Sequence, residues 1–183
     1  HLRSAPDGAV SLCLYAEKRT PDIDDLVSTL LDRRTITVAG MLAGRKFSHL
    51  GGGRSLRVHA GRIDYDVPID TFFQTHYGQA ERLLELVRTG LEAKPGDRLL
   101  DLYAGVGFFA LDAALDGAEV TAVEGHPAAN AAAARTAKRL GVGGSYLRLP
   151  VDARLFAGTS IKKRYDLVVL DPPRAGCGPE TAT

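Results

Sequence analysis

The sequence is poor in residues that build several common kinds of functional site. It has no tryptophan, one methionine and two cysteines, Cys13 and Cys177, which lie far apart and lack a metal-ligand spacing. So little cysteine does not indicate a disulfide framework or a zinc module, and free thiols in a reducing compartment are the simplest interpretation. We therefore expect a cytoplasmic protein without a bound metal.

The sequence also lacks an excess of charge and a long apolar run. Lys and Arg total 23 and Asp and Glu total 22, so the net charge of +1 gives no strong basic field for nucleic acid. Binding to RNA would then depend on a local patch. No stretch approaches the length of a membrane span and no signal peptide opens the chain, so we expect no membrane association.

Residues 1–70 carry the signals of a small mixed α+β domain. Short β-branched or alternating runs predict strands, and glycines and prolines separate them, including a turn at 51–53. A helix is predicted over Ile23–Arg33, after the Thr20-Pro21-Asp22 start signal. The predicted strands are Val10–Tyr15, Thr35–Val38, Leu56–His59 and Arg62–Val67.

Residues 71–183 alternate between helical and strand patterns, which predicts an α/β domain with a parallel sheet. A leading helix over Gln79–Leu91 precedes the alternation. The expected order is strand Arg98–Tyr103, helix Phe109–Asp116, strand Glu119–Glu124, helix Pro127–Leu140, strand Ser145–Leu149 and strand Asp166–Leu170.

The last of these strands ends in Asp171-Pro172-Pro173-Arg174, where neither proline can donate to a sheet ladder. Ligands of open α/β sheets bind just outside the carboxyl ends of strands, so this turn should lie at a site. We expect the strand to be central in its sheet. Because the chain starts at a histidine and stops soon after this turn, we expect it to be part of a longer protein.

A glycine loop, Asp101-Leu-Tyr-Ala-Gly105-Val-Gly107, follows the first strand of the alternation. Gly105 and Gly107 would let the backbone approach a ligand closely, and their spacing also fits a dinucleotide fingerprint. Asp101 favours a different cofactor, because its carboxylate would repel a pyrophosphate and attract an ammonium group. S-adenosylmethionine has that ammonium and no phosphate; alternatively, Asp101 only caps the loop.

Two further acidic residues follow the next strands. The two oxygens of Glu124 could accept hydrogen bonds from the two hydroxyls of a ribose, and Asp152 could reach an adenine amino group. The structural alternatives are an exposed carboxylate at a strand end for Glu124 and a turn residue for Asp152.

Together, Phe72-Phe73-Gln74, the glycine loop, Glu124 and Asp171-Pro-Pro-Arg174 resemble the S-adenosylmethionine-dependent RNA uracil-C5 methyltransferases, which make 5-methyluridine in transfer and ribosomal RNA. The resemblance covers about 70–176 and is faint over 1–69. It implies a Rossmann-like class I methyltransferase sheet, incomplete here, after a small mixed domain. It also implies an RNA substrate and a protein that is monomeric when complete.

The resemblance also implies a role for individual residues. Gln74 would contact the methionine end of the cofactor and border the target base, and Phe72 would contact the substrate. Tyr103 and Phe108 would line the cofactor pocket. The remaining assignments are Glu124 to the ribose, Asp152 to the adenine edge, Asp171 to the space between methionine and base, and Arg174 to the loop or an RNA phosphate.

Methylation at C5 of uracil requires covalent catalysis, in which a thiolate adds at C6 before the methyl transfer. The resemblance implies a cysteine nucleophile after a fifth strand and a glutamate base, both beyond Thr183. Cys177 is the weaker alternative, because it stands several residues from the Pro-Cys position that cytosine-C5 methyltransferases use. Cys13, within an apolar run, is expected to be structural.

Two other functions remain open at this point. Methyltransferases that act on exocyclic nitrogens carry an aromatic residue after the two prolines, where this chain has Arg174. A non-catalytic module that binds RNA or the cofactor is the other alternative. The sequence does not choose between transfer and ribosomal RNA.

Overall fold

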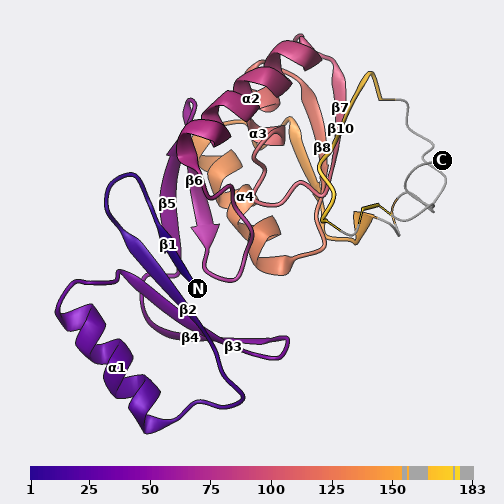
Figure 1. The fold of residues 1–183 in the computed structure, drawn as a ribbon. Coiled ribbons are helices and arrows are strands. Elements are labelled where there is room, and N and C mark those ends of the chain that lie inside the picture. The colour runs from indigo at the N-terminus through magenta and orange to yellow at the C-terminus, as the bar shows by residue number, and fades with distance from the viewer. Residues whose placement is uncertain (154–155, 157–164, 175, 178–183) are drawn as a thin grey trace.

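A computed structural model describes the chain except for residues 154–155, 157–164, 175 and 178–183. The described part has three sheets and four helices, shown in Figure 1. Within it, no helix is both long and apolar enough to cross a membrane. These same residues contain no group of three or more His, Cys, Asp or Glu side chains suited to hold a metal ion.

The amino-terminal sheet has the strand order β1-β2-β3-β4. Its strands β2 and β3 are parallel because helix α1 crosses between them, and α1 then packs against β4. The predicted strand at Val10–Tyr15 and the predicted helix are both confirmed. The bounds are β1 Leu2–Ser4, β2 Val10–Tyr15, α1 Pro21–Asp32, β3 Val38–Ala43 and β4 Lys46–Gly52.

Two predictions in this region are wrong. The run Thr35–Val38 contributes only its last residue to β3, which continues to Ala43. Gly51 and Gly52 end β4 and do not form a free turn. A Cβ atom on Gly51 would lie 2.6 Å from Cδ1 of Leu31, and one on Gly52 would lie 2.2 Å from the carbonyl oxygen of Thr37. The glycines therefore allow β4 to pass close to α1 and to the chain before β3.

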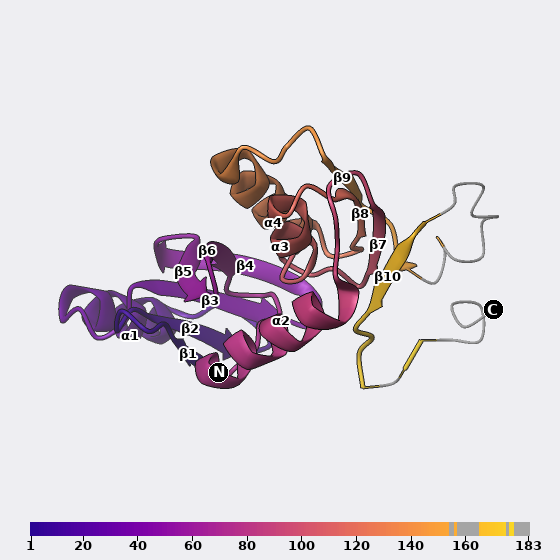
Figure 2. The same cartoon turned by 90° about the horizontal axis from the view of Figure 1, so that it is seen from above.

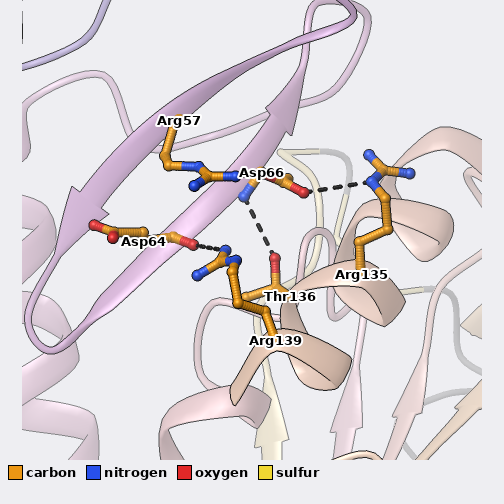
Figure 3. Close-up of polar contacts among 6 residues, drawn as sticks. All are labelled: Arg57, Asp64, Asp66, Arg135, Thr136 and Arg139. Atoms are coloured by element: carbon orange, nitrogen blue, oxygen red, sulfur yellow. Dashed lines mark hydrogen bonds and ion pairs between the residues drawn. The ribbon is translucent and has the colours of Figure 1, made fainter. Parts of the chain in front are cut away.

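Strands β5 (Ser55–Ala60) and β6 (Ile63–Pro68) form an antiparallel hairpin. Figure 3 shows how β6 contacts the helix α4 (Pro127–Leu140). The amide of Asp66 donates to Oγ1 of Thr136 at 3.4 Å, and the Asp66 carboxylate pairs with Arg135. Arg139 donates to the carbonyl oxygen of Asp64. The hairpin therefore lies directly on the helical layer of the second half of the chain.

The second half forms the predicted parallel sheet, with the order β10-β7-β8-β9. Helices α3 and α4 lie between this sheet and the β5–β6 hairpin, as Figures 1 and 2 show. The expected α/β fold is confirmed. The bounds are α2 Tyr77–Leu91, β7 Arg98–Leu102, α3 Ala110–Leu115, β8 Glu119–Val123, β9 Tyr146–Leu149 and β10 Leu167–Leu170.

Strand β10 was expected to be central, but within the described residues it lies at the edge of the sheet and pairs with β7 alone. Its side chains Val168 and Leu170 are 56% and 42% exposed. The strand therefore has the apolar sequence of a central strand, although two of its four side chains are partly exposed.

One apolar cluster connects the hairpin to the helices and the parallel sheet. In it, the ring of Phe108 lies 5.4 Å from that of Phe73 and 5.6 Å from that of Tyr65, measured between centroids. The buried Tyr65 hydroxyl donates to the carbonyl oxygen of Phe108 at 2.8 Å. The residues before and after position 70 thus share a core, and the division into domains 1–70 and 71–183 stays a prediction.

Candidate functional site

The carboxyl ends of β7, β8 and β10 form one edge of the parallel sheet, and two hollows meet there at Tyr103. The larger has a volume of about 430 Å³ and the smaller about 40 Å³. Tyr103, Glu124, Gly125, His126, Pro127, Asp152, Ala153, Pro173 and Gly176 line the larger hollow. Phe72, Phe73, Gln74, Tyr103, Ala104, Gly105, Val106, Phe108, Phe109 and Asp171 line the smaller one.

Glu124 follows β8 directly and its carboxylate is held by backbone amides on both sides. Oε2 accepts from the amide of Gly105 at 2.8 Å, and Oε1 accepts from the amide of His126 at 2.6 Å. Each carboxylate oxygen can accept a second hydrogen bond. Glu124 therefore fixes the glycine loop and the start of α4, and it keeps acceptor capacity toward the larger hollow.

The glycine loop turns three times through left-handed backbone conformation, with φ of +63° at Tyr103, +56° at Gly105 and +84° at Gly107. A Cβ on Gly107 would lie 2.9 Å from Leu111 and from the Tyr146 hydroxyl, whereas one on Gly105 would meet nothing within 4 Å. Gly107 is needed for packing, while Gly105 leaves open space at the hollow. Tyr103 adopts a conformation that costs a non-glycine residue energy, a kind of strain that clusters at functional sites.

Asp101 lies beneath this loop and lines neither hollow. It is 1% exposed, and neither carboxylate oxygen has a hydrogen bond of normal geometry from the described residues. Burial raises the pKa of Asp101 to about 8, against an opposing effect of the Ala110 amide. An unsatisfied buried carboxylate next to a ligand loop suits a cationic group, although the structure shows no open path to it.

The smaller hollow collects predicted residues from three distant segments. Gln74 comes from the chain before α2, Phe108 from the glycine loop, and Asp171 from the end of β10. Phe72 borders the same hollow and is 72% exposed. Phe108 is 7% exposed, and its ring packs mainly on Phe73 and Tyr65. A ligand here would therefore meet only the edge of Phe108.

Three other candidates take different positions. Asp152 lines the larger hollow with Glu124, and its role toward an adenine stays a prediction. Arg174 is exposed and lines neither hollow. Cys177 is half-buried and lines neither hollow, although its neighbour Gly176 lines the larger one. Cys13 is 1% exposed within β2, where it packs in the core.

His126 lines the larger hollow, and it was not selected from the sequence. It occupies the N-cap position of α4, and its Nε2 lies 3.8 Å from Oδ2 of Asp70. The available signal was its place two residues after Glu124, at the carboxyl edge of the sheet. A single loop histidine is too common for that signal to suffice.

Comparison with known proteins relates this chain to RNA methyltransferases, although no family model matches it. It is 27% identical over 174 residues to an uncharacterized RNA methyltransferase of Nanoarchaeum equitans, covering 91% of this chain and 38% of the relative. It is 35% identical over 120 residues to a 23S rRNA (uracil(747)-C(5))-methyltransferase of Vibrio cholerae. That match covers 63% of this chain and 31% of the relative. The chain thus spans about a third of the length of the curated relatives it matches.

Solved structures support the fold. The Pyrococcus abyssi tRNA (uracil-54, C5)-methyltransferase, solved with S-adenosyl-L-homocysteine, superposes with a TM-score of 0.74 at 23% identity, covering 98% of this chain and 44% of that protein. A tRNA m1G37 methyltransferase of Methanocaldococcus jannaschii superposes with a TM-score of 0.59 at 17% identity, covering 95% of this chain and 53% of that protein. Because these two proteins are named for different modifications, the fold by itself does not decide which atom is methylated.

Proposed function

Because this chain is related in sequence to RNA methyltransferases, some of them named for C5 of uracil, we propose that it forms the cofactor-binding part of such an enzyme. The enzyme transfers a methyl group from S-adenosylmethionine to C5 of a uridine in transfer or ribosomal RNA. The observation that carries the proposal is the pair of hollows joined at Tyr103, with acceptors placed in each.

The two hollows differ as the two ends of S-adenosylmethionine differ. Glu124 and Asp152 present oxygen acceptors in the larger hollow, where they suit the ribose hydroxyls and the adenine amino group. The smaller hollow leads past Gly105 to Gln74 and Asp171, which suit the methionine end. Among the described residues that line the two hollows, none is a lysine or an arginine, which agrees with a cofactor without phosphate.

When bound, S-adenosylmethionine supplies an electrophilic methyl group. The residues of this chain hold its nucleoside at Glu124 and Asp152 and border the reacting carbon with Gln74 and Asp171. Phe72, exposed at the rim of the smaller hollow, offers a face on which a displaced base can stack. Arg174, exposed after the β10 turn, is free to approach an RNA phosphate.

Activation of C5 needs a thiolate that adds at C6 and a base that removes the C5 proton. Cys13 is buried in the core, and Cys177 is not among the residues that line the smaller hollow, where the base would lie. We therefore place the nucleophile outside this chain. The chain should bind the cofactor without completing the reaction.

Calorimetric titration of the chain with S-adenosylhomocysteine and, separately, with NAD tests the cofactor. We expect saturable binding of S-adenosylhomocysteine and none of NAD; binding of NAD alone would refute the proposal. The reaction is tested with the full gene product, S-adenosylmethionine and unmodified transfer or ribosomal RNA, followed by mass spectrometry of the nucleosides. A new methylated nucleoside other than 5-methyluridine would show that the proposed base position is wrong.

A further inference from the structure

Arg3, on strand β1, reaches out of the amino-terminal sheet to the segment that precedes α2. Its Nη2 donates to the carbonyl oxygen of Thr71 at 2.6 Å, and its Nη1 donates to that of Pro68 at 3.3 Å. The hydroxyl of Thr71 also donates to the Pro68 carbonyl, at 2.9 Å. The guanidinium therefore ties β1 to the backbone at 68–71.

This guanidinium is buried at 9% exposure, and no ion pair among the described residues involves it. Burial lowers the pKa of Arg3, because the charge loses water without gaining a carboxylate. Nε has no hydrogen-bond partner in the described part of the chain. Such an arrangement is expensive for a side chain that only fills space, since apolar residues fill space at lower cost.

The segment that Arg3 holds leads directly into the smaller hollow. Thr71 and Phe73 are 6% and 3% exposed, and the ring of Phe73 packs on Phe108. The intervening Phe72 and the following Gln74 face the hollow. Phe72 and Gln74 follow Thr71 by one and three residues in a segment that is neither helix nor strand, so a shift of the backbone at Thr71 would displace both side chains.

The far end of the segment is also close to β1. Tyr77, the first residue of α2, has its pKa raised by burial, and both Arg3 and the Ser4 side chain oppose that rise. Residues 68–77 are thus bracketed by β1 at both ends. Only the stretch between the two contacts borders the candidate site.

We propose that Arg3 is a positioning residue, which sets the backbone at Thr71 so that Gln74 and Phe72 take their places at the cofactor and the base. The proposal rests on the proposed function for the identity of the ligand. It makes the amino-terminal sheet part of the site's machinery, although none of its strands borders either hollow.

A double-mutant cycle tests the coupling. The dissociation constant of S-adenosylhomocysteine is measured for the wild-type chain, Arg3→Met, Gln74→Ala and the double variant, with melting temperatures for each. We expect each single change to weaken binding about tenfold, and the double change to weaken it hardly more than Arg3→Met alone. Arg3→Lys, which can reach one carbonyl, should restore part of the affinity.

Two controls separate positioning from general loosening. Arg54→Met, at an exposed arginine of the same half of the chain, should leave binding unchanged. Glu124→Ala acts in the other hollow, so its effect should multiply with that of Arg3→Met. The proposal would be overturned if the effects of Arg3→Met and Gln74→Ala on the dissociation constant multiplied in the double variant. It would also be overturned if Arg3→Met lowered the melting temperature and left the affinity unchanged.

A measurement without ligand keeps the proposal independent of the cofactor. Hydrogen exchange of a peptide spanning 69–76 should be faster in Arg3→Met than in wild type or Arg54→Met. If the wild-type chain does not bind S-adenosylhomocysteine, the proposed function fails while this exchange still decides the role of Arg3. Unchanged exchange, or loss of folding in both Arg3→Met and Arg3→Lys, would assign Arg3 no positioning role.

Discussion

The carboxylate of Glu124 accepts a hydrogen bond from the amide of Gly105 at 2.8 Å, so the end of β8 fixes the loop that follows β7. The same carboxylate is the predicted partner of the ribose. One side chain therefore shapes the loop and offers acceptors to the ligand.

Glu124→Gln should weaken binding of S-adenosylhomocysteine by at least tenfold. Its amide nitrogen would face either the Gly105 or the His126 amide, and two donors repel each other. Titration calorimetry measures the change. Glu119→Gln, at the exposed start of β8, is the matched control and should bind like wild type. Equal affinity for Glu124→Gln would refute the ribose assignment.

Asp101 should make the chain less stable as pH rises. Its pKa of about 8 in the folded chain lies above the ordinary value of 3.8, so the folded state holds a proton that the unfolded state releases between these values. The free energy of unfolding should fall by up to about 1.4 kcal/mol per pH unit in this window. In urea denaturation from about pH 5 to 8, the free energy of unfolding of Asp101→Asn should vary less with pH than that of the wild type. The control Asp25→Asn, at an exposed carboxylate, should show the wild-type dependence on pH.

The same carboxylate predicts a proton linkage in binding. If the ligand ammonium pairs with Asp101, binding near pH 7 should release a proton, because the ionised form becomes favourable. Titration in buffers of different ionisation enthalpy measures the number of protons. Proton release that persists in Asp101→Asn would contradict the pairing of Asp101 with the ligand ammonium. It would favour the alternative in which Asp101 only caps the glycine loop.

The two loop glycines should respond differently to alanine. Gly107→Ala should destabilise the chain by about 2–4 kcal/mol, since its Cβ would collide with Leu111 and Tyr146 in addition to the backbone strain. Gly105→Ala has open space and should cost only about 1 kcal/mol. Chemical denaturation compares them. Similar losses for both would show that the loop packs differently.

Arg62 should contribute more to the stability of the chain than Arg57, the other arginine of the hairpin. It pairs with Asp112 at 2.7 Å and Asp116 at 2.8 Å, and Asp112 is 2% exposed. Arg62→Ala leaves a buried carboxylate without its cation and should cost about 3 kcal/mol. Arg57→Ala removes an exposed arginine from Asp66, which keeps its pair with Arg135 (Figure 3), and should cost less than about 1 kcal/mol. Comparable losses would argue against a buried-charge effect.

Much of the fold was predictable because local patterns dominate it. The helix over Pro127–Leu140 and the strand over Val10–Tyr15 were placed to the residue, and the alternation after position 98 gave the parallel sheet. Predictions failed where glycine served a long-range contact, as at Gly52 beside Thr37. They also missed β1, whose three residues carry too short a pattern to recognise.

The site was predictable as a set of residue types at strand ends, and less so as a set of contacts. Their places at strand ends selected Glu124, Asp152 and Asp171, and the family resemblance added Gln74; all four line the two hollows. Strand-end position also selected Asp101, but only the tertiary structure shows that this carboxylate is buried and has no hydrogen bond of normal geometry from the described residues. Arg3 carried no local signal, because its partners are backbone carbonyls more than sixty residues away.

The sequence alone therefore determined the order of elements, the parallel sheet and the chemistry gathered at its carboxyl edge, since periodicity and strand-end residues are local properties. The tertiary structure decided how the two hollows divide at Tyr103, which carboxylate is buried, and that β1 holds the segment carrying Gln74. Those features depend on distances between distant parts of the chain, and packing sets these distances.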